Sequence, residues 1–526
     1  MLRMLAIMPT NMPQKIVQNM PASKTAEFFQ KVYTRVYGWL GSQKFFYIIV
    51  ALLVFQALWI ALTARYPQAF DENYHFGLIR LHAEQWLPYF TSHPPGGEVY
   101  GAVSRDPSYL FHFLFSLPYR LLATATDSVA VQVISLRLAN VALFVGGLLA
   151  YRKLLAELKI SRRITNVVLF FFVLTPIMPL LAGQINYDNL IFLLTGLLFY
   201  VTVKFLRRLR EHDIFDGSLL LQILVYILFA GLVKYTSTPL SLALMAIILF
   251  VVVRHFYRTA SSFRDSIVWP KKVVLLLLVT LVLLLGGLSL ERYGVNLARY
   301  HTPVPDCADV LTVEQCKSYS PWVRDYIYSQ SYPKPSAWGV FVYPGVWAHR
   351  MVFETMFTVS SRFASDGTVE YQAEPPLTVA NYTAWTLTVV GAVLMLYYLR
   401  RLWRLVYLRY LLLAIIFYTL TLFAKNFSMY LHTGEAMAIH GRYLIPVFPV
   451  IYAAIALVFA LFADHRLYRP QVKTWLVIVT FLLLLQGAGI ITWIMQSDSR
   501  WYWQQSSPSQ TLNRTTQNVL EYLIVK

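Results

Sequence analysis

Long apolar runs dominate this chain of 526 residues. Hydrophobic residues make up 57% of the sequence and charged residues only 13%, whereas about a quarter of a soluble domain is charged. The runs are roughly 16–23 residues long, the length that an α-helix needs to cross the hydrocarbon core of a bilayer. The sequence therefore predicts an all-α polytopic membrane protein.

Eleven apolar segments are predicted to span the membrane: 45–63, 128–150, 164–182, 188–203, 218–234, 238–253, 273–290, 382–399, 410–424, 443–463 and 474–495. If the N-terminus lies inside, the inner segments carry 27 Lys and Arg against 7 Asp and Glu, and the outer segments 17 against 19. Basic residues collect on the cytoplasmic side of membrane proteins. We therefore expect a plasma (inner) membrane protein with a cytoplasmic N-terminus and an outer C-terminus. This topology accounts for the net charge of +19 without a nucleic-acid partner.

The predicted spans divide the chain into regions. These are a cytoplasmic segment 1–44, a transmembrane module 45–290 with a first outer loop 64–127, a large outer loop 291–381, C-terminal spans 382–495 and an outer tail 496–526. In the first loop, one stripe of an amphipathic helix is predicted from Phe76, Ile79, Ala83, Trp86, Leu87 and Phe90. The segment 107–122 is expected to lie on the outer face, joined to that helix through the hinge HPPGGE.

The two cysteines, Cys307 and Cys316, both fall in the large outer loop, nine residues apart. An oxidising compartment permits a disulfide between them. The alternative is a pair of free thiols in a compact loop. Two cysteines alone do not make a zinc site, so no metal is expected there.

Charged residues gather at the predicted outer ends of the spans. They are Asp71 and Glu72 after the first span, Arg137 inside the second, Asp188 between the third and fourth, Lys234 at the end of the fifth, and His440 and Arg442 at the start of the tenth. Ionisable residues at such depths are costly and often functional. Acids and bases from distant parts of the chain are thus expected to meet at one level.

Each of these residues also has a structural interpretation. Asp71 and Glu72 could cap the following helix, and Asp188 could cap the fourth span, because carboxylates favour helix N-termini. Arg137 could snorkel or pair with a carboxylate, and Lys234 and Arg442 could be interface anchors. The histidines could be ordinary interfacial residues. Their coincidence on one side favours a shared functional site.

A carboxylate beside several cations at an outer membrane surface fits a donor linked to a lipid phosphate. Lys and Arg hold phosphate through charge-assisted hydrogen bonds, and a carboxylate can deprotonate an acceptor hydroxyl as general base. Arg350, His75 and His93 complete the candidate substrate-binding set. The outer loops contain no D-x-D, and basic residues can neutralise one phosphate, so neither a metal nor another cofactor is expected.

Two stretches of the first loop carry a family resemblance. FDENYHFG, from Phe70, resembles the FDE-x-HFG motif of protein O-mannosyltransferases, with one extra residue before His75. YFTSHPPGG, from Tyr89, resembles the YF-x-x-HPP-x-G stretch of the same family, and SLRLAN resembles its segment around Arg137. The order of loops and spans is similar to the wider GT-C class of membrane glycosyltransferases.

The resemblance implies a GT-C fold that transfers a monosaccharide from a polyprenyl-phosphate donor to an acceptor hydroxyl. Asp71 would be the base, Glu72 its neighbour, Arg137 a phosphate or carboxylate partner, and Asp188 the second-loop acid. The acceptor could be a glycan, a lipid or a secreted protein. A transporter or lipid flippase is the main alternative. Transporters often have charges within their spans and an inverted repeat, but this sequence has few mid-span charges and no convincing internal repeat. A non-catalytic scaffold of the cell envelope is a third hypothesis.

Overall fold

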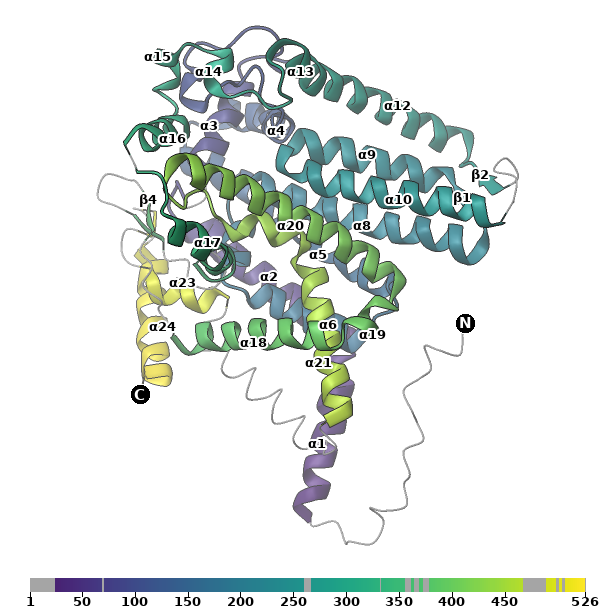
Figure 1. Cartoon of the computed structure of the whole chain (residues 1–526). Helices are drawn as coiled ribbons and strands as arrows, with labels where there is room; N and C mark the ends of the chain where they lie inside the picture. Colours follow the sequence, from purple (N-terminus) through teal and green to yellow (C-terminus); the bar gives the residue numbers. More distant parts are fainter. Residues whose placement is uncertain are drawn as a thin grey trace.

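The computed structural model describes residues 24–68, 71–259, 266–331, 333–354, 361–363, 369–371, 378–466, 489–497, 501–503 and 507–525. Within these residues the chain is almost entirely helical (Figure 1). Seven helical stretches are long and apolar enough to cross a membrane: Gln43–Thr63, Val129–Glu157, Tyr187–His212, Tyr235–Arg258, Lys272–Tyr300, Val406–Thr433 and Gly441–Ala463. The prediction of an all-α polytopic membrane protein is confirmed.

Nine of the eleven predicted spans coincide with long helices. These are α2 (Gln43–Thr63), α5 (Val129–Glu157), α8 (Tyr187–His212), α9 (Gly217–Val233), α10 (Thr238–Thr259), α12 (Lys272–Ser289), α18 (Thr378–Tyr397), α20 (Val406–Thr433) and α21 (Phe448–Arg466). The segment 164–182 is instead divided into α6 (Arg162–Leu174) and α7 (Ile177–Ala182). Thr175 is extended before Pro176, as expected because proline disfavours the helical conformation of the residue before it. Most of 474–495 lies outside the described residues, so the number eleven stays a prediction.

The first loop contains α3 (Glu72–His82), the 3₁₀ turn η1 (Gly97–Tyr100) and α4 (Leu110–Ala125). The amphipathic stripe predicted over 76–90 is wrong beyond Ala83, because α3 ends at His82. At this end of α3, the Tyr89 hydroxyl donates a hydrogen bond to the Leu81 carbonyl at 3.1 Å, and Arg120 donates one to the His82 carbonyl at 3.0 Å. These contacts turn the chain back on itself, so that α3 is buried against α4 and does not lie along a surface.

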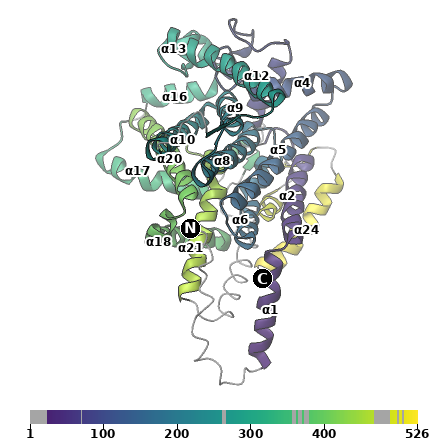
Figure 2. The same cartoon turned by 90° about the vertical axis from the view of Figure 1, so that its right-hand side faces the viewer.

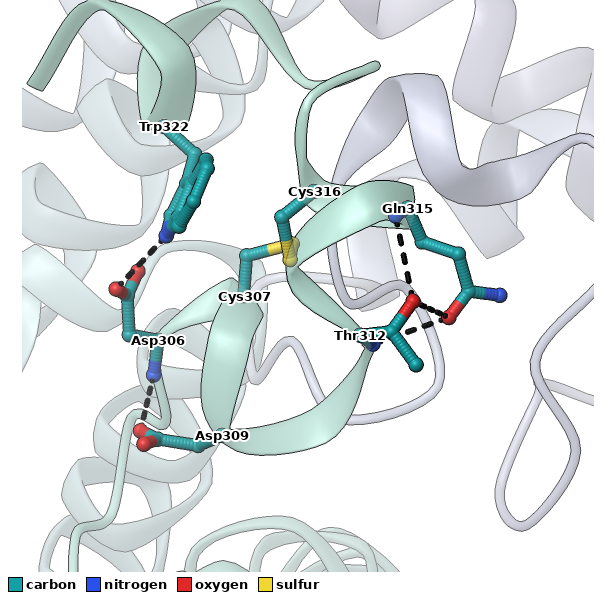
Figure 3. Close-up of a disulfide and its surroundings, with 7 residues drawn as sticks. All are labelled: Asp306, Cys307, Asp309, Thr312, Gln315, Cys316 and Trp322. Carbon is teal, nitrogen blue, oxygen red and sulfur yellow. Dashed lines mark hydrogen bonds between the residues drawn. A yellow bond between two sulfur atoms is a disulfide. The ribbon is translucent and has the colours of Figure 1, made fainter. Parts of the chain in front are cut away.

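The large loop is built from short helices. From α12 a π-helical turn η3 (Leu290–Gly294) leads to α13 (Val295–Tyr300), followed by α14 (Cys307–Val310), α15 (Val313–Cys316), α16 (Ser320–Ser331), α17 (Ala337–His349) and the π turn η4 (Arg350–Glu354). Cys307 and Cys316 form a disulfide with a Cα–Cα distance of 5.9 Å. Figure 3 shows this disulfide beside the Thr312–Gln315 capping box, which fixes the start of α15. The disulfide and the cap make a rigid, stapled segment.

The remaining elements are small or peripheral. They are α1 (Lys24–Leu40), β1 (Phe215–Asp216), η2 (Tyr235–Ser237), β2 (Ile267–Val268), β3 (Ser361–Phe363), β4 (Val369–Tyr371), α19 (Leu399–Trp403), η5 (Gly441–Val447), α23 (Ile490–Gln496) and α24 (Ser507–Val525). The strands β1 and β2 pair in parallel, and β3 and β4 are antiparallel with Ser361 opposite Tyr371. In both Figure 1 and Figure 2, α1 projects away from the bundle, and α12 lies beside α9 at its edge.

Helices α5 and α8 form the centre of the bundle. A Cβ at Gly147 of α5 would lie 2.2 Å from the Phe192 ring of α8, so only glycine allows this close approach. Phe192 stacks on Phe144 at 4.5 Å and on Phe172 at 5.2 Å between ring centroids. This packing fixes the position at which α8 begins. We call the end of the bundle where α2 and α9 end and α8 begins the site end.

Candidate functional site

Three ion pairs lie at the site end, and together they contain six of the residues predicted from the sequence. Glu72 pairs with Arg137, Asp188 pairs with Lys234, and Asp71 pairs with Arg442. The carboxylates come from α3, the residue before it, and α8, and the cations come from α5, the residue after α9, and η5. Acids and bases from distant segments thus meet in three pairs, and their common level in the membrane stays a prediction.

Asp71 is the most accessible member of the three pairs. Its side chain is 56% exposed, whereas that of Arg442 is only 6% exposed, and Arg442 Nη2 lies 2.6 Å from Asp71 Oδ2. Asp71 precedes α3 in the left-handed conformation, with φ 69°, and its side chain makes no capping hydrogen bond. Aspartate tolerates this conformation better than most residues. The capping interpretation of Asp71 is thus wrong, because the carboxylate turns toward Arg442.

Electrostatics keep Asp71 ionised. Burial of the surrounding site acts to raise the pKa of this carboxyl, but the charge and hydrogen bond of Arg442, followed by the charges of His440 and Lys234, outweigh that effect. The net result is a pKa below the usual value. A carboxylate that is ionised and reachable can accept a hydrogen bond, or a proton, from a bound molecule.

Glu72 differs sharply from its neighbour, because it is completely buried. Both carboxylate oxygens receive hydrogen bonds from Arg137, each at 2.7 Å, and the backbone N–H groups of Gln68 and Ile185 donate to them at 2.8 and 3.0 Å. Arg137 is also fully buried and donates to the Ala61 carbonyl. This bidentate pair ties the first loop, α2, α5 and the turn before α8 together. Of the two roles considered for Arg137, carboxylate partner is the one that matches the geometry.

Asp188 and Lys234 form a second buried pair, in which Lys234 Nζ donates to Asp188 Oδ1. Asp188 does not cap α8, because Asn186 Oδ1 accepts from the Asp188 N–H at 2.9 Å and takes that role. The rings of Tyr187 and Tyr443 each lie 4.5 Å from Lys234 Nζ, measured to their centroids. The ammonium is thus enclosed by one carboxylate and two aromatic faces, which can stabilise a cation.

The predicted histidines are neutral rather than cationic. His75 Nδ1 lies 2.9 Å from His112 Nε2, and the two rings stack at 5.2 Å. Burial lowers the pKa of both imidazoles well below the usual value, and nearby charges act in the same direction. Burial, followed by the charge of Arg442, lowers the pKa of His440 to about 3. At neutral pH these residues can donate or accept hydrogen bonds but add no positive charge.

Two other predicted residues are placed differently. Arg350 donates to the backbone carbonyl of Ala436. His93 lies against Gly97 within its own turn, where a Cβ on the glycine would be 3.2 Å from the ring Nε2. Among the described residues, no group of three or more His, Cys, Asp or Glu side chains could hold a metal ion.

Comparison with protein-family models and with curated proteins finds no match. Among solved structures, the chain is similar to the archaeal oligosaccharyltransferase AglB from Archaeoglobus fulgidus, in complex with an inhibitory peptide and a dolichol-phosphate. The two share 13% sequence identity with a TM-score of 0.38, and the match covers 90% of this chain and 60% of that chain. The assignment of a function therefore rests on this chain's own residues.

The structure adds tyrosines that the sequence analysis missed. The Tyr74 and Tyr319 ring centroids are 6.5 Å apart, and Tyr319 also packs against Gly101, whose Cβ would lie 3.0 Å from its ring. The Tyr319 N–H bonds the Cys316 carbonyl at 3.0 Å, directly beside the disulfide. The stapled segment therefore forms one wall next to α3. A tyrosine three residues after a paired cysteine was the available signal in the sequence.

A further polar group lies on the same side. Lys425 of α20 bonds the Tyr235 hydroxyl at 2.9 Å, and the Tyr235 N–H bonds Ser108 Oγ at 3.0 Å. Asp106 bonds the Ser108 N–H at 2.8 Å. Burial raises the pKa of Asp106, although the Ser108 hydrogen bond and the charge of Arg292 oppose the increase. These residues extend the site from the ion pairs toward the large loop.

Proposed function

We propose that this chain is a GT-C-type glycosyltransferase that moves a monosaccharide from a polyprenyl-phosphate donor to an acceptor hydroxyl at the outer face of the membrane. One observation carries the proposal: an accessible carboxylate, Asp71, is held by a buried guanidinium, Arg442, next to a second buried cation, Lys234. An ionised base and two phosphate-binding cations are the parts that this transfer needs.

In the proposed reaction, Asp71 accepts the proton of the acceptor hydroxyl while the acceptor oxygen attacks the anomeric carbon of the sugar. The bond between that carbon and the phosphate oxygen breaks, and its electron pair leaves with the polyprenyl phosphate. Arg442 and Lys234 stabilise the negative charge on the departing phosphate. Direct displacement of this kind inverts the anomeric centre, and all the atoms and charges balance without a metal.

The other predicted residues take supporting roles in this proposal. The Glu72–Arg137 pair is a buried framework that fixes the start of α3 and so the position of Asp71. Asp188 positions Lys234, because the two are in direct contact. We assign to neutral His75 and His440 the donation of hydrogen bonds to sugar hydroxyls. Tyr74 and Tyr319 offer aromatic faces to the sugar or the acceptor.

The test is transfer by an Asp71→Asn variant in proteoliposomes that contain a panel of polyprenyl-phosphate hexoses. Loss of a general base lowers turnover by about 10²- to 10⁴-fold, while donor binding, measured as a shift of the unfolding temperature, should persist. Asp127→Asn is the matched control, because Asp127 is an exposed acid of the same loop. Retained turnover in Asp71→Asn would show that Asp71 is not the general base. Movement of lipid by the wild type without a covalent product would favour a transporter.

A further inference from the structure

A cavity of about 360 Å³ lies at the opposite end of the bundle from the ion pairs. Its lining includes four basic residues from the last turns of α8: Lys204, Arg207, Arg208 and His212. The spacing i, i+3, i+4, i+8 places all four on one face of the helix. One acid, Glu157 at the end of α5, also lines the cavity. The lining is therefore predominantly basic.

Two of the arginines that line the cavity form ion pairs. Arg207 Nη1 lies 2.6 Å from Glu157 Oε1, and Arg208 pairs with Asp216 of β1. Each guanidinium has five N–H donors, so both arginines keep donors for a second anion. In the described part of the chain, neither Lys204 nor His212 forms an ion pair. The ammonium of Lys204 thus remains available to an anion inside the cavity, whereas Arg207 and Arg208 already pair with acids.

The length of α8 relates this cavity to the membrane. Asp188 and Lys204 are 16 positions apart on one unbroken helix, and His212 is the last residue of that helix. At 1.5 Å per residue, Lys204 lies about 24 Å from Asp188, and His212 about 36 Å. The hydrocarbon core of a bilayer is about 30 Å thick. If Asp188 lies at one boundary of the bilayer, the cavity lies at the headgroup level of the other leaflet.

The surroundings of the cavity are apolar. Ile214 and Val268 complete the lining, and Trp269, which is 55% exposed, packs its ring over Gly217. Tryptophan is enriched at the boundary between membrane and water. Shortly after Val268 the chain enters α12, where one exposed apolar face is made of Val273, Leu276 and Leu277. The acyl chains of a lipid can pack against this apolar surface, whereas an inorganic phosphate has no apolar part that could.

We propose that this cavity binds the phosphodiester headgroup of an anionic phospholipid, with its acyl chains in the bilayer beside α12. Lys204 supplies the charge, Arg207, Arg208 and His212 supply N–H donors, and Trp269 marks the headgroup level. The site does not depend on the proposed transfer reaction, because it lies at the other end of α8.

The test is native mass spectrometry of the full chain released from nanodiscs of phosphatidylcholine with or without phosphatidylglycerol. The wild type should retain phosphatidylglycerol in preference to phosphatidylcholine. Lys204→Gln should reduce that retention by about fivefold, the effect expected for one basic residue at an anionic surface. Lys204→Gln/His212→Gln should reduce it further.

Arg210→Gln is the matched control, because Arg210 carries the same charge on the same helix but does not line the cavity. It should retain phosphatidylglycerol as the wild type does, and equal unfolding temperatures would show that the variants fold. Equal retention of the two lipids by the wild type, or equal losses in Lys204→Gln and Arg210→Gln, would overturn the proposal. If millimolar inorganic phosphate alone displaced phosphatidylglycerol, the site would be a soluble-phosphate site, and the proposal of a lipid site would be overturned.

Discussion

Arg442 donates from Nη2 to Asp71 Oδ2 at 2.6 Å, although the two residues are 371 positions apart in the sequence. The pair joins a buried cation to an exposed anion. In the proposed reaction, a donor phosphate would therefore compete with Asp71 for the guanidinium. Binding of the donor would release the carboxylate at the moment when a base is needed.

The pH dependence of transfer should report this pair. The pKa of Asp71 is lowered, so the base stays ionised as the pH falls until it passes that lowered pKa, and activity is lost only below it. The same ion pair contributes stability above the unfolded pKa, and that contribution is lost as the pH falls through the folded pKa. Arg442 is the main group that offsets the effect of burial on the pKa of Asp71. Arg442→Gln should therefore raise that pKa and move the acid limb of kcat/KM to higher pH. Arg442→Lys keeps the charge and should move it less. An acid limb that Arg442→Gln leaves in place would show that Asp71 does not control it.

The Glu72–Arg137 pair should matter for stability. Removal of one partner of a buried ion pair costs about 3–5 kcal/mol, because the other charge is left without compensation. Glu72→Gln and Arg137→Met should each lower the unfolding temperature strongly, and the double variant should be less destabilised than the sum of the two. Arg324→Gln breaks an exposed pair with Asp325 and should cost no more than about 1 kcal/mol. Additive effects of Glu72→Gln and Arg137→Met would contradict the framework role.

Asp188 should act through Lys234. Lys234→Met removes a charged hydrogen-bond donor, so we expect donor affinity to fall by about 10- to 100-fold. Asp188→Asn should also weaken binding, because the ammonium loses its anchor. The double variant should bind no more weakly than Lys234→Met alone, as measured by titration with donor. Fully additive losses would mean that Asp188 contacts the substrate itself.

Gly101 should be needed to seat the stapled segment. It has φ 79° and ψ −153°, and a Cβ there would lie 3.0 Å from the Tyr319 ring. Only glycine adopts this conformation readily, so Gly101→Ala should cost about 1–3 kcal/mol. Gly286→Ala is the control, because a Cβ in that helical position meets no atom within 4 Å and should raise stability by up to about 1 kcal/mol. The two variants should shift the unfolding temperature in opposite directions, and equal shifts would exclude the conformational explanation.

Hydropathy alone predicted where most helices lie, because a bilayer leaves few alternatives for a 20-residue apolar segment. The same pattern failed over 76–90, where Trp86 and Leu87 continue an apolar stripe beyond the true end of α3. That end is fixed by Tyr89 and Arg120, which bond the carbonyls of Leu81 and His82. Periodicity contains no information about such tertiary hydrogen bonds.

The site was predicted in composition but not in detail. The sequence of two adjacent acids does not show that Glu72 is buried against Arg137 while Asp71 stays accessible. The difference arises from the left-handed backbone of Asp71 and from its pairing with Arg442 of η5. Arg350 shared the charge and predicted side of Arg442, yet it bonds a backbone carbonyl. Tyr319 carries no charge and was overlooked, although the disulfide brings it to α3.

The long sequence separation between Asp71 and Arg442 also bears on how the protein is made. At roughly 5–20 residues per second, a ribosome needs about 20 to 75 seconds to travel from one codon to the other. The partners of Glu72 and Asp188 follow them by only 65 and 46 positions. Two of the pairs can therefore form while the chain is still being synthesised, whereas Asp71 waits for η5. A nascent chain interrupted before residue 441 would hold an assembled framework with its exposed acid unpaired.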